Sequence, residues 1–448
     1  MAGQQHRSGH YRFRTGDQAL VRQINLSVIM HHLRENAPIS RAALAETTGL
    51  NKTTVSSLVR ELIERQFVRE VGFESSGSRR GAGRLAVLLT LDPGAGFIVS
   101  AEIGVDFLSV VCTNFAPEII WRQKETITPD LGQHVILDRV LALLRQAVAI
   151  GRDTCNNMLG ISIGVPGLVD QASGTLLFAP NLGWQDVPLG KILSDAFDVQ
   201  VLVDNEASVG ALGEHYFGAA QGFDDVLYIS AGVGLGGGIV HSGRIYSGVA
   251  GFGGEFGHMT MDPQGDLCNC GNRGCWETQV SQRALFRYVR TAIERGYVSM
   301  LTGMTKGDLS QLTVPLVAEA ADAGDPLALE ALERIGHHLG IGIASLVNAL
   351  NPELVVFGGI LSLAGQYLLP AVERELKQRA LRWNRSATQV VLARHGFDAC
   401  VMGGVARVYQ AILAEPDNIR RQAAWAVPAQ VINSTDGMSR KEVRSQAE

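Results

Sequence analysis

The chain has 448 residues, of which 46% are hydrophobic and 19% charged, and its formal net charge is −5. This length exceeds one ordinary compact domain, so we expect two or three domains with substantial cores. No run of 18 apolar residues is present, and Leu339 to Leu350 fits a buried helix better than a membrane span. The first 17 residues lack a signal-peptide core. We therefore expect a cytoplasmic protein without membrane segments.

The charge is distributed unevenly along the chain. Residues 1–90, called the head here, carry 13 Lys and Arg against 7 Asp and Glu, whereas the remainder has a net charge of −11. A basic head on an acidic body indicates that the head binds a polyanion. The predicted organisation is a head (1–90), a body (91–413) and a polar tail (414–448) that we expect to be disordered.

The head opens with a helical pattern. Leu20, Ile24 and Val28 recur every four residues, which places them on one helical face. The segment 36–38, Asn-Ala-Pro, ends this helix because proline lacks a backbone N–H. Ser40 is a suitable N-cap for a short helix, Arg41–Thr48, that ends at Gly49.

A third helix follows the glycine turn and is capped by Asn51. Its apolar residues have amphipathic spacing, namely Val55, Leu58, Val59, Leu62 and Ile63. Helix, glycine-containing turn and helix predict a helix-turn-helix, whose second helix lies in the major groove of DNA. The residues left on its outer side are the predicted DNA contacts Lys52, Thr53, Ser56, Ser57 and Arg60.

Two predicted strands, Phe67–Phe73 and Leu85–Leu91, flank the segment ESSGSRRGAGR and complete a winged helix. Arg79, Arg80 and Arg84 in this wing are suited to a minor groove. The alternative is a helical protein-interaction domain with a solvated charged face. Positive charge, capped helices and an Arg/Gly wing together favour DNA binding.

The body alternates strands with helices, which predicts an α/β fold with ligands bound past the strand ends. The predicted elements are a strand pair over Ile98–Val111, a helix near Gln133–Ile150, and strands Leu159–Val165, Val201–Val203 and Val226–Ser230. The loop Gly232–Gly238 contains a G-x-G-x-x-G pattern, but Ile239-Val240 continues as strand. It therefore fits a turn between strands better than a dinucleotide site.

Residues 251–277 combine a glycine-rich segment with a possible metal site. Cys268, Cys270, Cys275 and His258 offer three thiolates and one imidazole, the ligand types of a structural zinc site. The alternative is a disulfide or unpaired thiols, although one residue between Cys268 and Cys270 disfavours a bridge between those two. The other cysteines, Cys112, Cys155 and Cys400, fit ordinary buried thiols.

The segment SAGVGLGGGIVHSGRIYSGVAGFGGEFGH, followed by the cysteine cluster and Trp276-Glu277, resembles the signature of the ROK family of repressors, open reading frames and sugar kinases. The motifs GVPG at 164–167, PNLGW at 180–184 and NPELVVFGG at 351–359 resemble it too. The resemblance covers about residues 15–410. It implies a winged helix-turn-helix followed by two actin-like α/β lobes with a sugar in the cleft.

The resemblance also implies a set of sugar-binding residues: Asn181, Asn205, Glu206, Glu255, His258 and Glu277. Amides and carboxylates suit sugar hydroxyls, which both donate and accept hydrogen bonds. His258 would serve two sites, with one ring nitrogen on the metal and the other presented to the sugar.

Two positions depart from the ROK kinases. Their phosphate-binding Asp-x-Gly-Gly-Thr is matched here by residues 102–106, in which Val105 replaces the second glycine and Asp106 the threonine. Glu206 stands where the kinases have a catalytic aspartate. We therefore expect no catalytic residues and no enzyme activity. The segment DNEASVGALGE is similar to the xylose-repressor branch, although Ser208 replaces its usual asparagine.

The sequence thus predicts a repressor of carbohydrate genes, with xylose as a candidate effector. Its expected partners are operator DNA, a monosaccharide and a second copy of the chain, in a homodimer or larger oligomer. One alternative is an ATP-dependent sugar kinase with an appended DNA-binding head. Another is a zinc-stabilised interaction protein with a cleft that binds nothing.

Overall fold

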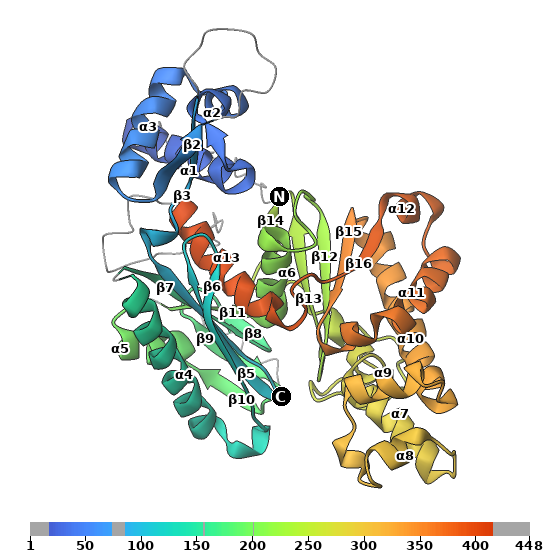
Figure 1. Ribbon diagram of the computed structural model, residues 1–448. Coiled ribbons are helices and arrows are strands. Elements are labelled where there is room, and N and C mark those ends of the chain that lie inside the picture. The colour runs from blue at the N-terminus through green and yellow to red at the C-terminus, as the bar shows by residue number, and fades with distance from the viewer. Residues whose placement is uncertain (1–17, 74–85, 156, 200, 415–448) are drawn as a thin grey trace, which may run out of the picture.

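The computed structural model describes residues 18–73, 86–155, 157–199 and 201–414 (Figure 1). A small domain, the head, sits at one end of the first of two α/β lobes. Among the described residues, no helix is long and apolar enough to span a lipid bilayer. The segment Leu339 to Leu350 forms the second half of a helix, α10, whose inner side is buried in the second lobe.

The head is a winged helix-turn-helix. Its sheet has the order β1-β3-β2. Its elements are α1 Gln18–Asn36, β1 Ile39–Ser40, α2 Arg41–Thr48, α3 Lys52–Glu64, β2 Val68–Phe73 and β3 Val87–Leu91. Strands β2 and β3 pair antiparallel, as predicted for the wing. The three wing arginines, Arg79, Arg80 and Arg84, lie outside the described residues, and so does the tail after residue 414.

The predicted caps of the helix-turn-helix are present. The Ser40 side chain accepts a hydrogen bond from the backbone N–H of Ala43, and Asn51 accepts one from Thr54 at 2.8 Å. Gly49 ends α2 with a φ of 70°, in the left-handed region that glycine adopts without strain. These local contacts mark the two ends of α2 and the start of α3.

The inner face of α1 differs from the one that the four-residue spacing suggested. Leu20 and Ile24 are exposed, whereas the buried side chains are Leu26, Ile29, Met30 and Leu33. The buried set has the i, i+3, i+4, i+7 spacing of an amphipathic helix, and it faces both the rest of the head and α13 (Ala399–Ala414) of the body.

The first lobe is built on a five-stranded sheet in the order β11-β7-β4-β5-β6. Its strands are β4 Phe97–Ile103, β5 Phe107–Asn114, β6 Ile119–Thr126, β7 Met158–Val165 and β11 Val201–Asn205. Helices α4 (Gln133–Thr154) and α5 (Leu189–Phe197) pack on one face. A small sheet beside it contains β8 Leu168–Asp170, β9 Thr175–Ala179 and β10 Trp184–Val187. The predicted hairpin, helix and strands of this lobe are confirmed.

The second lobe repeats the same pattern, two antiparallel pairings followed by two parallel ones, in the order β14-β13-β12-β15-β16. Its strands are β12 Val226–Ala231, β13 Leu235–His241, β14 Arg244–Ile245, β15 Leu354–Gly358 and β16 Gln389–Leu392. Its helices are α7 Gln282–Glu294, α8 Met300–Met304, α9 Val314–Asp322, α10 Pro326–Leu350, α11 Gly365–Arg379 and α12 Arg382–Ala387. The glycine-rich loop is a turn between β12 and β13, as predicted.

Two helices lie between the sheets (Figure 1). Helix α6 (Glu206–Phe217) leads from the first lobe to the second, and α13 (Ala399–Ala414) leads back. α13 packs on the sheet of the first lobe and α6 on the sheet of the second. Both helices start beside the cleft between the lobes, so they connect that cleft with the two sheets.

Candidate functional site

The outer side of α3 carries the predicted DNA contacts. Its inner side is buried through Val55, Leu58, Val59 and Leu62. The side chains on the opposite side are exposed at Lys52, Thr53, Ser57 and Arg60 and half-buried at Ser56. This face therefore offers hydroxyl and basic groups to a partner, which is the chemistry that base edges and phosphates accept.

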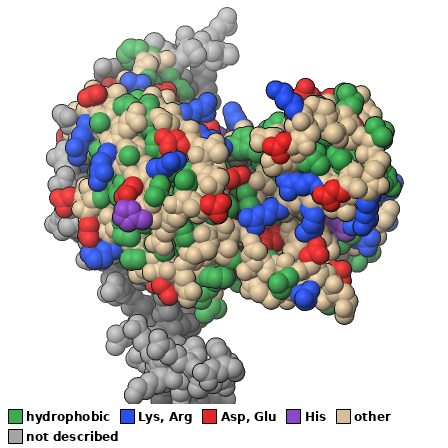
Figure 2. Space-filling view, turned by 90° about the horizontal axis from the view of Figure 1, so that it is seen from below, with side chains coloured by type: hydrophobic (Ala, Val, Ile, Leu, Met, Phe, Trp, Pro, Cys, Tyr) green, Lys and Arg blue, Asp and Glu red, His purple; other side chains and the backbone are tan. Residues whose placement is uncertain are grey.

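A cleft of about 330 Å³ lies between the lobes. Figure 2 shows the two lobes from below, side by side. The structure brings all six residues of the predicted sugar set to this cleft: Asn181, Asn205, Glu206, Glu255, His258 and Glu277. They come from four separate segments of the chain, so only the folded arrangement assembles them.

The two asparagines are held by their surroundings. Asn205 caps α6, its side-chain oxygen accepting from the N–H groups of Ala207 and Ser208, and its amide nitrogen donates to the Gly167 carbonyl at 3.1 Å. Asn181 accepts hydrogen bonds from Asn269 at 2.8 Å and from Arg283 at 3.0 Å. Both amides are thus fixed at the cleft wall before any ligand arrives.

Three carboxylates face the same cleft. Glu206 begins α6, and Glu255 precedes a short helical turn, η3 (Phe256–His258). Glu277 is 8% exposed, and its Oε2 accepts from the backbone N–H of Leu235 at 3.3 Å. Carboxyl groups gathered in a partly enclosed cleft suit a neutral polyhydroxylated ligand, because an ionised carboxyl accepts from hydroxyls and a protonated one can also donate.

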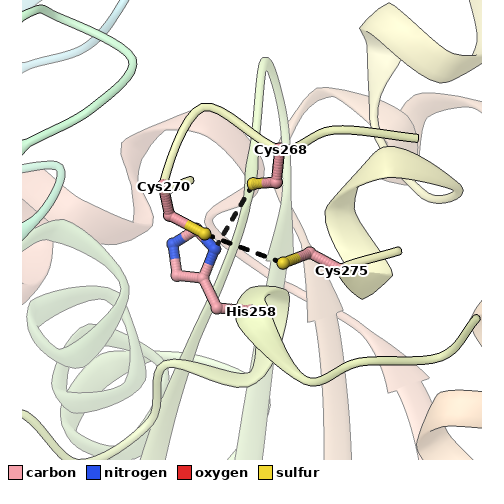
Figure 3. A group of neighbouring side chains, drawn as sticks. All are labelled: His258, Cys268, Cys270 and Cys275. Atoms are coloured by element: carbon pink, nitrogen blue, oxygen red, sulfur yellow. Dashed lines mark hydrogen bonds between the residues drawn. The ribbon is translucent and has the colours of Figure 1, made fainter. Parts of the chain in front are cut away.

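The four predicted metal ligands form one cluster (Figure 3). Their ligand atoms, one from each of His258, Cys268, Cys270 and Cys275, all lie within 4.8 Å of one another. The Sγ atoms of Cys270 and Cys275 are 3.7 Å apart. Two sulfurs bound to one tetrahedral zinc ion at about 2.3 Å would be separated by about 3.8 Å. The residues present therefore fit a four-coordinate metal ion.

The ring of His258 connects this cluster with the cleft. Its Nδ1 lies 3.7 Å from the Sγ of Cys268, and its Nε2 lies 3.8 Å from a carboxylate oxygen of Glu255. The Sγ of Cys268 also lies 2.9 Å from a carboxylate oxygen of Glu277. The cluster therefore borders the cleft at His258 and at Glu277.

Of the remaining cysteines, Cys112 and Cys400 are buried, as predicted. Cys155 is half-buried, and its Sγ donates to the carbonyl of Gly94 at 3.3 Å. The prediction of a buried thiol was wrong there, since Cys155 directly follows α4, at the edge of the first lobe.

Glu102 also lines the cleft, and the sequence analysis did not predict it as a site residue. It is 8% exposed, and its Oε2 has no hydrogen-bond partner among the described residues, as is also true of Glu206. Burial, with the Glu206 carboxylate adding to it, raises the pKa of Glu102 to about 8. Burial, with Glu255 adding to it, also raises the pKa of Glu206 to about 8. These two carboxyls are therefore protonated over much of the neutral range.

The free energy of unfolding should fall as the pH rises from about 4.5 to about 8. An unfolded glutamate titrates near 4.5, whereas folded Glu102 keeps its proton to about 8, so the folded state binds more protons in between. Glu102→Gln retains a neutral, similarly shaped side chain and should flatten this fall. Denaturant titrations at pH 5, 6, 7 and 8 would measure it. Glu319→Gln, on the exposed side of α9, is the control, and an equal slope in both variants would contradict the assignment.

Other cleft residues carried no signal in the sequence. Three of them are aromatic. Tyr228 belongs to β12, and Phe107 and Phe397, which are far apart in the sequence, are brought together in the cleft by folding. The ammonium group of Lys124 lies 4.0 Å from the ring centre of Phe107 and 4.4 Å from that of Phe397. An alignment would be needed to single out such aromatic residues, because no local pattern distinguishes them from core.

The two domains each match a known family. The model of the ROK family matches residues 98–411, and that of the winged helix-turn-helix DNA-binding domain matches residues 25–69. The xylose repressor of Caldicellulosiruptor bescii (strain ATCC BAA-1888 / DSM 6725 / KCTC 15123 / Z-1320) is 35% identical over 402 residues, which cover 90% of this chain and 99% of that protein.

Two solved structures are similar. The first is a ROK family transcriptional regulator described as a homolog of the E. coli MLC protein, with a TM-score of 0.74 and 30% identity over 88% of this chain and 97% of the other. The second is a ROK family glucokinase from Streptomyces griseus in complex with glucose and AMPPNP, with a TM-score of 0.65 and 31% identity over 70% of this chain and 100% of the other. The repressor and the regulator are matched almost end to end, head included, and the chain belongs to the ROK family.

Proposed function

We propose that this protein is a sugar-responsive transcriptional repressor of carbohydrate genes, which a monosaccharide, with xylose as the first candidate, releases from operator DNA. One observation carries the proposal: an exposed recognition helix and a cleft lined by amides and carboxylates occur in one molecule, and the core of the head is continuous with that of the body. The similarity to a xylose repressor over 90% of the chain supports xylose as the first sugar to test.

The proposed DNA contacts are Lys52, Thr53, Ser56, Ser57 and Arg60 on α3, together with Arg79, Arg80 and Arg84 of the wing. The proposed sugar contacts are the six cleft residues. Because a helix-turn-helix commonly reads two half-sites, we propose that the protein acts as a homodimer or a larger homo-oligomer. A cytoplasmic location, where operator DNA is found, follows from the same proposal.

Zinc is the metal that we propose for the cysteine cluster. Three thiolates and one imidazole are a closed, sulfur-rich ligand set, which is typical of structural zinc sites and leaves no position for a reacting water. His258, Cys268, Cys270 and Cys275 would hold the ion. Its contribution would be to stabilise the loop that carries His258 and to fix the orientation of its ring.

A titration of the protein on DNA from its own upstream intergenic region tests the function. We expect tight binding at low salt, and release by one sugar from a panel led by xylose and glucose. The expected weakening is roughly 5- to 150-fold, the usual range for linked sites. Lys52→Ala should weaken binding without changing the preferred sugar. Binding that no sugar alters would contradict the effector, and no binding at low salt would contradict the whole proposal.

The alternative is a sugar kinase, which the likeness to the glucokinase favours. The side chains at the expected phosphate position argue against it. Asp106 lines the cleft there, with its carboxylate held by the Gln282 amide at 3.0 Å, and a fixed negative charge repels nucleotide phosphates. Robust ATP-dependent turnover of xylose or glucose in a coupled assay would favour the kinase.

A further inference from the structure

Both helices that join the lobes begin at the cleft. Asn205 and Glu206 line it at the start of α6, and Ala399 and Cys400 line it at the start of α13. The two helices cross in close contact, because Gly213 and Gly403 leave no room for a Cβ atom against the backbone of the other helix. A ligand in the cleft therefore touches or adjoins the first turn of both helices at once.

The helices belong to different lobes. α13 packs on the first sheet through Val401, Val405 and Val408, whereas Ala211 of α6 packs against the strands of the second sheet. Any closure of the lobes is therefore also a movement of α6 relative to α13.

One buried carboxylate ties the two crossings together. Glu214 of α6 is 0% exposed and accepts three backbone hydrogen bonds. They come from Ala219, where α6 leaves for the second lobe, and from Arg394 and His395, just before α13. This carboxylate holds α6 to the segment just before α13. When one lobe moves relative to the other, the two helices therefore rotate about this point, and their far ends move.

The far ends of these helices both contact the head, and they also contact each other, with Phe217 of α6 edge-on to Tyr409 of α13 at 6.2 Å between ring centres. On the α13 side, Phe67 of the head meets Phe115 edge-on at 5.4 Å between ring centres, and Phe115 stacks on Tyr409 at 4.8 Å. On the α6 side, the guanidinium carbon of Arg34, in α1, lies 4.0 Å from the ring centre of Tyr216. The Arg34 side chain is 14% exposed, so this cation–π contact is largely shielded from water.

We propose that Arg34 and Tyr216 are positioning residues that make operator affinity depend on the sugar. This inference rests on the proposed function. The aromatic support and the buried side of α1 hold the head to α13, and the Arg34–Tyr216 contact adds a link from α1 to α6. A rotation of α6 relative to α13 therefore changes the orientation of the head, and with it the presentation of α3 to DNA.

The test is the ratio of operator Kd values with and without saturating D-xylose, or glucose if glucose is the sugar that releases DNA. In Arg34→Met, which keeps the length and apolar stem but loses the cation, we expect this ratio to fall toward one, by about fivefold or more. The sugar Kd without DNA should stay unchanged, because Arg34 is remote from the cleft. Tyr216→Leu should behave in the same way as Arg34→Met.

Two matched variants separate coupling from simple structural damage. Arg34→Lys keeps the charge and Tyr216→Phe keeps the ring face, and both should retain most of the ratio. An Arg34→Met protein that loses operator affinity equally with and without sugar would overturn the proposal, since the contact would then be only structural. A wild-type protein whose operator affinity ignores every sugar would instead overturn the proposed function, and this inference with it.

Discussion

A Cys270→Ser variant should purify without bound zinc and unfold at a lower temperature than the wild-type protein. Cys270 contributes one of four converging ligand atoms, with its Sγ 3.7 Å from that of Cys275. A serine hydroxyl stays protonated at neutral pH and is a poor ligand, so the remaining three groups hold the ion weakly. Because metal binding is coupled to folding, the midpoint of thermal unfolding should fall by about 10 °C.

Mass spectrometry of the native protein measures the metal directly, with about one zinc per wild-type chain expected from the four-ligand set. Cys155→Ser is the matched control, since Cys155 is half-buried and lies outside the cluster. It should keep both the metal and the unfolding temperature. A Cys270→Ser protein that retains one zinc per chain would refute the assignment of these ligands.

The second large effect is expected from Glu255→Gln, which should bind operator DNA normally but fail to release it when sugar is added. In the wild type, the Glu255 carboxylate can accept from two sugar hydroxyls, and the replacement turns one acceptor into a donor. Hydrogen bonds to a charged group are the stronger class, so sugar affinity should fall about 100-fold or more. Calorimetry with the released sugar gives this value, and an operator titration gives the retained DNA affinity.

Glu319→Gln serves as the control here too, because it makes the same chemical change on an exposed helix surface outside the cleft. It should respond to sugar like the wild type. If Glu255→Gln were released at the wild-type sugar concentration, the effector would have to bind elsewhere. If it lost DNA binding as well, the loop of residues 251–258 would be needed for the fold of the repressor rather than for the ligand.

Local features of the head were predictable from sequence because local contacts determine them. Ser40, Gly49 and Asn51 mark the helix ends through hydrogen bonds and backbone conformations within a few residues. The buried face of α1 was predicted from the wrong set of residues. Leu20 and Ile24 recur every four residues, but Leu26, Ile29, Met30 and Leu33 have the fuller i, i+3, i+4, i+7 pattern, and these are the side chains that the fold covers.

Some of the cleft residues were likewise predictable from sequence, and others were not. The ROK-like segment of residues 230–277 supplied Glu255, His258 and Glu277, because their spacing around the cysteines is itself the pattern. Glu102 lies in the segment that was compared with a phosphate loop, but only Val105 and Asp106 were singled out there, and its burial near Glu206 appears first in three dimensions. Glu214 and Arg34 lie in ordinary helical sequence, and their contacts join segments far apart in the chain, which no local pattern encodes.

His258 presents opposite ring nitrogens to the cysteine cluster and to the carboxylate of Glu255. The same imidazole would therefore contact both the metal ion and the sugar. Without the ion, the ring would lose its orientation toward the cleft, and a higher sugar concentration would be needed to fill the cleft. If the proposed function and the proposed zinc site both hold, a zinc-poor protein would then need more sugar for its release from operator DNA, and induction would depend on the metal supply as well as on the nutrient.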